Sequence, residues 1–205
     1  MEDRRMFLKI LAGVSAGITL AGTTLAETKV SDRLGYVLPK RKLGRTNEFV
    51  TMLGTGGFHV GWTTERDAQE VIEASMEGGI RFFDTAERYA DGTSEIRYGK
   101  YLTPKYRDLI FLTSKSTGKD AKTVIEHLEG SLRRLKTDHL DLYQVHAIST
   151  PEDVESRIQL GVLDVLLKAK EEGKIRYLVL PATKIRSPMH ECLKERKNQI
   201  FSTLF

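Results

Sequence analysis

Ile80-Arg81-Phe82-Phe83 and Leu109-Ile110-Phe111-Leu112 are short runs in which almost every residue is apolar. Similar runs, rich in β-branched and aromatic residues, begin at Phe49, Leu140, Ile175 and Ile200. Successive runs start 25 to 35 residues apart, an interval that fits one strand followed by one helix. Because the runs do not alternate with polar residues, they are typical of parallel strands covered on both faces. The pattern therefore predicts an α/β fold.

Amphipathic segments separate the runs and carry residues that favour helix ends. Thr64 and Asp120 are suitable N-caps, and Pro151 suits the first turn of a helix. Gly78 and Gly173 follow two of the segments and are expected to end them. These signals predict helices over residues 65–76, 121–135 and 151–172. Residues 40–43 and 49–51 flank a polar turn and predict a small hairpin ahead of the first unit.

Two parallel architectures fit this pattern, an open doubly wound sheet and a closed (β/α)8 barrel. Gly54-Thr55-Gly56-Gly57 follows the first run and superficially matches a dinucleotide-binding fingerprint. The glycines of that fingerprint must open the helix that binds the pyrophosphate, whereas residues 58–63 separate these glycines from the next helix cap. We therefore interpret the glycine-rich segment as a tight turn from a strand into a loop.

Chemically active residue types stand where three of the runs end. Asp84 ends the second run, Lys115 the third and His146 the fourth, and Tyr89 lies five residues beyond Asp84. Parallel strands bring their last residues to one edge of a sheet, about 4.8 Å apart. If the strands are neighbours in chain order, we expect the three side chains within about 10 Å of one rim. Tyr89 is expected to fold back over that rim.

The four side chains suit donation of a proton to a carbonyl group. A phenol is a poor acid at neutral pH, and a nearby ammonium such as Lys115 favours its ionised form. Asp84 would balance that ammonium, and a neutral His146 would stabilise charge that develops on a carbonyl oxygen. The set holds no hydride donor, so a nicotinamide must supply one. In the alternative interpretation these residues have only structural roles: Tyr89 is an aromatic residue of a loop, His146 is a core histidine, and Asp84 and Lys115 form a plain ion pair.

Residues 82–95, FFDTAERYADGTSE, closely resemble the signature of the aldo-keto reductases, and LTSK at 112–115 and DLYQVH at 141–146 agree with the family in the same order. The resemblance implies a (β/α)8 barrel and reversible reduction of a carbonyl with NADPH or NADH. It matches Asp84, Tyr89, Lys115 and His146 to the catalytic tetrad, with Tyr89 as general acid. It also places Gly56, Gly57 and Phe58 where the first loop approaches the cofactor.

The chain departs from this family in two respects. Residues 39–205, after a linker at 27–38, hold five strand-helix units and the start of a sixth strand, whereas a full barrel takes about 250 residues. We therefore expect an incomplete barrel of about five and a half units, with open strand edges that permit self-association. After the fifth run the chain reads Val179-Leu180-Pro181-Ala182-Thr183, where the family usually has a glycine and a Ser/Thr-Asn-like pair that hold the nicotinamide amide. We therefore expect the proton-donating residues to be intact and the cofactor-binding residues after the fifth run to be altered.

Composition and charge argue against several other classes of function. The 32 basic and 28 acidic residues leave a net charge of +4, and the basic residues are dispersed. We therefore expect no nucleic-acid partner. Cys192 is the only cysteine, which excludes an intrachain disulfide and a cysteine-ligated metal cluster. The histidines outside the predicted site lack metal-ligand spacing, so no metal is expected.

Residues 1–26 differ in kind from the rest of the chain. Arg4-Arg5 precedes Phe7-Leu8-Lys9, an uncharged stretch runs from Ile10 to Leu20, and small residues lead to Ala26. This is the three-part pattern of an export signal, and its paired arginines resemble a twin-arginine signal. The apolar part is shorter than the ~20 residues of a spanning helix, so we expect no stable membrane anchor. We expect a periplasmic or other extracytoplasmic protein that uses the export machinery.

Three hypotheses about function follow from these observations. The first is an exported aldo-keto reductase, incomplete in this sequence, that acts on a small carbonyl substrate. The second is a truncated, inactive remnant or an interaction protein. The third is an open flavodoxin-like sheet that binds another ligand, for which a strand order of 2-1-3-4-5 is diagnostic.

Overall fold

The computed structural model describes residues 30–179, in which five parallel strands form one sheet in chain order. These strands are β5 (Thr55–Gly56), β6 (Phe82–Asp84), β7 (Phe111–Ser116), β8 (Leu140–Val145) and β9 (Ile175–Val179). The sequential order is that of a (β/α)8 barrel, and the described part is an incomplete barrel of this type. The alternative of an open flavodoxin-like sheet is therefore wrong, because that sheet would interleave its first strands.

Two antiparallel hairpins precede the parallel sheet. The strands β1 (Ser31–Asp32) and β2 (Gly35–Tyr36) form the first, and β3 (Lys40–Lys42) and β4 (Phe49–Thr51) form the second. The second hairpin confirms the prediction from the polar turn. The first lies within the segment expected to be a linker, and Asp32 there pairs with the buried Arg81 of the barrel at 2.6 Å.

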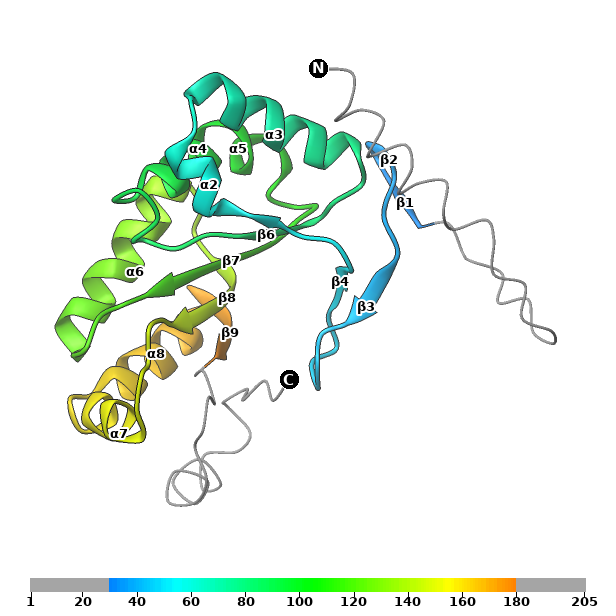
Figure 1. Cartoon of the computed structure of the whole chain (residues 1–205). Helices are drawn as coiled ribbons and strands as arrows, with labels where there is room; N and C mark the ends of the chain where they lie inside the picture. Colours follow the sequence, from blue (N-terminus) through cyan, green and yellow to red (C-terminus); the bar gives the residue numbers. More distant parts are fainter. Residues whose placement is uncertain (1–29, 180–205) are drawn as a thin grey trace.

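Seven helices are described, and Figure 1 shows them gathered along one side of the curved sheet. They are α2 (Gly57–Trp62), α3 (Glu65–Glu77), α4 (Thr93–Tyr101), α5 (Thr103–Tyr106), α6 (Ala121–Leu135), α7 (Pro151–Gln159) and α8 (Val162–Glu171). The Thr64 side chain accepts a hydrogen bond from the Asp67 backbone, and Asp120 accepts one from Thr123. Both predicted N-caps are therefore confirmed, and α3 and α6 span the predicted residues.

Three details of the predicted elements are wrong. The long helix from Pro151 is two helices, because Gly161 adopts a left-handed conformation with φ of +77° that a right-handed helix does not continue. The run at Phe49 pairs antiparallel with β3, so the parallel sheet begins later, at Thr55. The segment after the glycines is helix α2 and not a loop.

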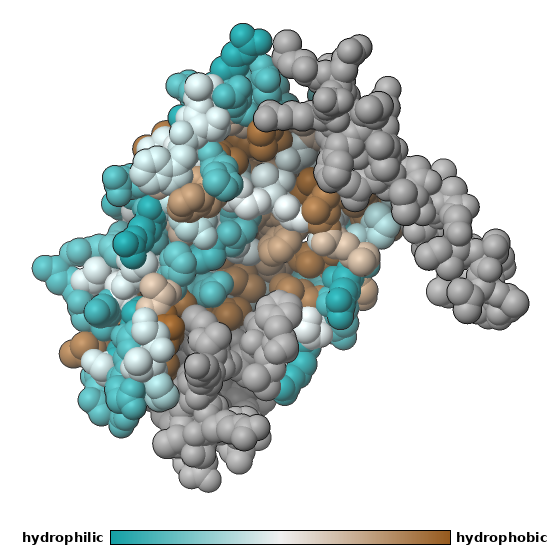
Figure 2. Space-filling model, in the orientation of Figure 1, coloured by the Kyte–Doolittle hydropathy of each residue, from teal (hydrophilic) through white to brown (hydrophobic). Residues whose placement is uncertain are grey.

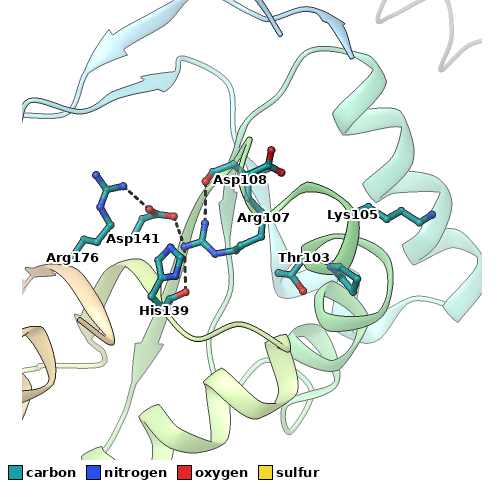
Figure 3. A pocket seen from close by; sticks show the side chains of 9 residues that line it. Thr103, Lys105, Arg107, Asp108, His139, Asp141 and Arg176 are labelled. Carbon is teal, nitrogen blue, oxygen red and sulfur yellow. Dashed lines mark hydrogen bonds and ion pairs between the residues drawn. The ribbon is translucent and has the colours of Figure 1, made fainter. Parts of the chain in front are cut away.

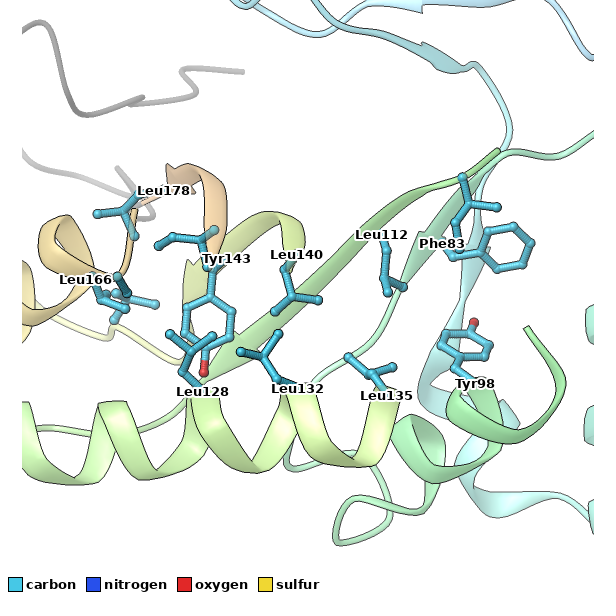
Figure 4. Close-up of a cluster of buried hydrophobic side chains, with 14 of the residues drawn as sticks. Phe83, Tyr98, Leu112, Leu128, Leu132, Leu135, Leu140, Tyr143, Leu166 and Leu178 are labelled. Atoms are coloured by element: carbon cyan, nitrogen blue, oxygen red, sulfur yellow. The ribbon is translucent and has the colours of Figure 1, made fainter. Parts of the chain in front are cut away.

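The hydrophobic core lies between the sheet and its helices. Phe83, Leu112, Tyr143 and Leu178 are completely buried. Figure 4 shows Leu112 and Tyr143 over α6, and Phe83 over Tyr98 of α4. Leu128, Leu132 and Leu135 complete this cluster from the helix. Because side chains alternate along a strand, the residues between them face the interior of the barrel.

The inner face of the sheet is mixed in character. Strand register places Asp84 beside Thr113 and Lys115 beside Gln144, so polar side chains gather toward the carboxyl ends of the strands. Figure 2 shows apolar side chains in the middle of this view, between the sheet and the second hairpin. Exposed apolar residues of the hairpin region are Phe49, Met52 and Leu53.

Several sequence-based predictions lie outside the described residues. These are the export signal at 1–26, Cys192, the sixth run from Ile200, and positions 180–183 of the segment that differs from the family. Between residues 30 and 179, no helix is both long and apolar enough to cross a membrane.

Candidate active site

Lys115 stands at the centre of the site, at the carboxyl edge of the sheet. Its Nζ lies 2.6 Å from Asp84 Oδ2 and donates hydrogen bonds to the Tyr89 hydroxyl at 3.0 Å and to the Thr85 backbone oxygen at 2.8 Å. The three N–H groups of the ammonium therefore have three acceptors. The Lys115 side chain is only 10% exposed, so these contacts replace most of its hydration.

Asp84 is held by two neighbours. Its Oδ2 binds Lys115, and its Oδ1 accepts a hydrogen bond of 2.8 Å from Thr113 Oγ1. Thr113 is two residues before Lys115 on β7, so both side chains point to the same face of the sheet. Thr113 belongs to the LTSK segment of the sequence, for which no separate role of the threonine was predicted. The spacing of two residues between Thr113 and Lys115 in a strand is the sequence feature that could have placed Thr113 beside Asp84.

Tyr89 comes from the loop between β6 and α4. The loop reverses sharply, because Ala90, Asp91 and Gly92 all have positive φ angles, of 50°, 51° and 84°. Non-glycine residues rarely adopt this conformation, and they do so where the surrounding structure holds them. The far end of the loop is fixed by the buried Glu95, which accepts hydrogen bonds from Ser114 Oγ at 2.6 Å and Arg134 Nε at 2.8 Å.

His146 directly follows β8 and lies edge to face against Tyr89. The two ring centroids are 6.1 Å apart and the rings are inclined at 84°. Burial of the ring, together with the positive charge of Lys115, lowers the pKa of His146 below its ordinary value of 6.5. The imidazole is therefore neutral at pH 7. Its Nδ1 is buried and has no hydrogen-bond partner among the residues that the structure describes.

The structure thus brings together the four side chains that the sequence placed at one rim. The ion pair comes from β6 and β7, the imidazole directly follows β8, and the phenol lies in the loop after β6. The arrangement combines the Tyr89 hydroxyl group, the Lys115 cation at its oxygen, and a neutral imidazole whose Nδ1 has no hydrogen-bond partner within residues 30–179. Such a site can give a proton to an oxygen atom and stabilise the negative charge that the donor acquires.

Gly56, Gly57 and Phe58 border the same site. Gly56 pairs with Asp84 in the sheet, and an added Cβ there would meet nothing within 4 Å. A Cβ on Gly57 would lie 2.6 Å from the Asp84 backbone oxygen, so only glycine fits at the start of α2. The half-exposed Phe58 ring lies 5.4 Å from the Tyr89 ring, edge to face. Phe58 in turn contacts Trp62, which is 66% exposed.

A cavity of about 410 Å³ lies at the opposite edge of the sheet. Figure 3 shows that Arg107 and Arg176 point toward Asp141, whereas Lys105 points away from them. Arg107 and Arg176 form ion pairs with Asp141 at 2.9 Å and 2.8 Å, so the charge of this buried carboxylate is balanced. None of the four candidate residues lines it. Within residues 30–179, no group of three His, Cys, Asp or Glu side chains is placed to hold a metal ion.

Comparison with protein families and curated sequences agrees with this geometry. The family model described as the aldo/keto reductase family matches residues 52–200. The uncharacterized oxidoreductase YqkF of Bacillus subtilis is 31% identical over 149 residues, which cover 67% of this chain and 47% of YqkF. The chain therefore spans about half the length of this curated relative.

Solved structures give a similar result. The holo form of aldo-keto reductase AKR11C1 from Bacillus halodurans is 30% identical, with a TM-score of 0.63, and the match covers 80% of this chain and 55% of that one. An aldo-keto reductase from Klebsiella pneumoniae, solved in complex with NADPH, is 31% identical with a TM-score of 0.56, over 66% of this chain and 46% of that one.

Proposed function

The chain belongs to the aldo/keto reductase family, and from this premise we propose that its site reduces an aldehyde or ketone to an alcohol with hydride from NADPH or NADH. The observation that carries the proposal is the 3.0 Å hydrogen bond from Lys115 Nζ to Tyr89 Oη. This contact supplies a stabilised proton donor in a site that has no hydride donor of its own.

Tyr89 is the proton donor to the carbonyl oxygen. When its hydroxyl releases the proton, the phenolate oxygen remains within hydrogen-bond distance of the Lys115 ammonium, which stabilises the negative charge. Asp84 balances the charge of Lys115 and, with the Thr85 backbone oxygen, fixes the position of Nζ. Solvent then returns a proton to Tyr89, so that the residue is restored after each turnover.

His146 orients the carbonyl group. Its lowered pKa leaves the ring neutral, so one ring nitrogen carries a hydrogen that can be donated to the carbonyl oxygen. A neutral ring also avoids a second cation beside Lys115, which would compete for the developing charge. Phe58 and Tyr89 form an aromatic wall on one side of the place where the carbonyl would bind.

The described residues fit a nicotinamide cofactor on two observations. Gly56 leaves open space beside Asp84, and the buried Nδ1 of His146 lacks a partner within the described chain. Gly56, Gly57 and Phe58 would hold the cofactor at this edge. When bound, the cofactor supplies the hydride to the carbonyl carbon. The NADPH bound by the Klebsiella pneumoniae relative supports this choice of cofactor.

The function is tested with the full chain by two measurements. NADPH binding is followed by fluorescence titration, and NADPH oxidation is followed with methylglyoxal and an aromatic aldehyde as probes. We expect saturable binding and aldehyde-dependent oxidation. Binding without oxidation would favour an interaction protein, and absence of both would favour an inactive remnant.

Export and self-association are further parts of the proposal. The paired Arg4-Arg5 and the uncharged stretch after them support export of the folded chain by the twin-arginine route. Fusion of residues 1–26 to a fluorescent reporter should place it in the periplasm, and a change of both arginines to lysine should retain it inside. In the described sheet β5 and β9 have one neighbour each, which supports pairing between copies. Sedimentation measures that association.

A further inference from the structure

Arg157, on α7, is a buried arginine next to the segment that carries His146. The residue is only 3% exposed. Its Nε and one terminal nitrogen donate to Asp153 at 2.9 and 3.1 Å, and the remaining contacts are to backbone oxygens of Gly118 at 3.1 Å, His146 at 3.2 Å and Ala147 at 3.3 Å. The five N–H groups of the guanidinium thus meet five acceptors.

The backbone that Arg157 binds has an unusual conformation. Ala147 has a φ of +55°, in the left-handed region that residues with a side chain rarely adopt. Such a conformation persists where neighbouring groups hold it in place. Here the carbonyl groups of His146 and Ala147 both accept from one guanidinium, so the turn and the arginine depend on each other.

His146 is therefore fixed on both sides of its α-carbon. Its backbone N–H donates to the Ser116 oxygen at 2.7 Å, which extends the pairing of β8 with β7. Its carbonyl oxygen accepts from Arg157. These two contacts fix the backbone that carries the imidazole, whose ring centroid lies 6.1 Å from that of the Tyr89 ring.

We propose that Arg157 is a positioning residue, which holds the turn after β8 and thereby places the His146 ring against Tyr89. This inference rests on the proposed function for its catalytic consequence. The positioning itself is a statement about the ring and is measurable without turnover.

Arg81 provides a matched control for a merely structural role. It is 2% exposed, contacts both oxygens of Asp32 at 2.6 and 3.0 Å, and donates to the backbone oxygens of Met76 and Ile80 at 2.8 Å each. The two arginines therefore have the same burial and the same kinds of partner. Arg81 precedes β6 at the amino-terminal edge of the sheet, whereas Arg157 lies beside the catalytic edge.

The experiment compares Arg157→Met with Arg81→Met in the full chain. We expect a similar loss of thermal stability in both variants. Only Arg157→Met should move the His146 pKa, measured by NMR titration, up toward 6.5, because the released ring gains contact with water. Lys115, Asp84, Glu87 and Arg88, the other charged groups around that ring, are unchanged in both variants. Because Arg157→Met also removes a cation beside His146, Arg157→Lys is measured as well, since a pKa shift in that variant cannot come from a lost charge. We also expect kcat to fall 10- to 100-fold in Arg157→Met alone, since small displacements of catalytic groups cost rates of that size.

The outcomes separate the two proposals. A His146 pKa that does not move in folded Arg157→Met, or that moves equally in Arg81→Met, overturns the positioning role. If Arg157→Met does not fold, Arg157→Lys is the deciding variant, because lysine keeps the charge but offers three N–H groups from one atom. An unchanged His146 pKa in Arg157→Lys contradicts the positioning role, and a raised His146 pKa supports it. If the unaltered chain shows no turnover, the proposed function fails while the His146 titration still tests the positioning.

Discussion

Lys115 on β7 donates a 3.0 Å hydrogen bond to the hydroxyl of Tyr89, a residue 26 positions earlier in the chain that comes from the loop after β6. The same ammonium lies 4.6 Å from the centre of the Tyr89 ring, so the cation is close to both the oxygen and the aromatic system. Two neighbouring parallel strands produce this contact, since the register of β6 and β7 brings the loop after one strand over the end of the next.

Lys115→Met should remove the stabilisation of the Tyr89 phenolate and leave Asp84 without its cation. We expect kcat to fall by at least about 100-fold, in the range for loss of one preorganised charge. The thermal midpoint should also fall, because Asp84 remains partly buried. Steady-state kinetics and thermal unfolding measure the two effects. Lys105→Met, at an exposed ion pair with Glu73 away from the site, is the control and should change neither.

His146 predicts a specific dependence of stability on pH. Its pKa in the folded chain lies below the unfolded value of 6.5, so the unfolded chain binds more protons in between. The contribution of His146 to stability is therefore complete above about pH 6.5 and is lost as the pH falls through the folded pKa. Asp32 and Asp153, whose pKa values are lowered by arginines, lose their contributions only at more acid pH, below their ordinary value of 3.8.

Urea unfolding of the chain and of His146→Gln, at a series of pH values between 5 and 7.5, isolates this contribution. The stability difference between the two proteins should change with pH only in the lower part of that range. A constant difference would show that His146 has the same pKa in the folded and unfolded chain.

Gly56 and Gly57 are adjacent but should respond differently to alanine. Gly57→Ala places a Cβ 2.6 Å from a backbone oxygen that cannot move away freely, so we expect a loss of stability of about 1–3 kcal/mol. Gly56→Ala meets no atom within 4 Å and should leave stability nearly unchanged, while it weakens NADPH binding by filling the space beside Asp84. Unfolding curves and fluorescence titration distinguish the two. Equal stability of both variants would contradict the packing of α2 on β6.

Leu128→Ala should test the core between the sheet and α6. Leu128 is completely buried, so we expect a loss of unfolding free energy of about 2–5 kcal/mol from lost burial and the cavity that remains. Val71→Ala on the exposed face of α3 is the control and should change stability by less than about 0.5 kcal/mol. Comparable losses of unfolding free energy in both variants would mean that packing of α6 against the sheet does not stabilise the core.

The strands and the site residues were predictable from the sequence because both depend on local pattern. The apolar runs predicted β6 to β9, and consecutive strands then placed Asp84, Lys115 and His146 at one edge. The break between α7 and α8 was not predicted. Gly161 is a residue type that can end a helix, but it lies inside one long amphipathic segment, and its φ of +77° is seen only in the structure. Arg157 and Asp153 are readable as an i, i+4 ion pair, but that spacing says nothing about the carbonyl groups of the turn after β8.

The role of Tyr89 as proton donor is tested by the rate of NADPH oxidation with an aldehyde, measured for the full chain and for Tyr89→Phe, with NADPH affinity measured in parallel. We expect a fall of about 100-fold or more in kcat with unchanged NADPH affinity, since only the proton donor is removed. Tyr101→Phe, which loses a hydroxyl hydrogen-bonded to Glu65 outside the site, should turn over normally. Undiminished turnover in Tyr89→Phe would contradict the assignment of Tyr89 as the acid.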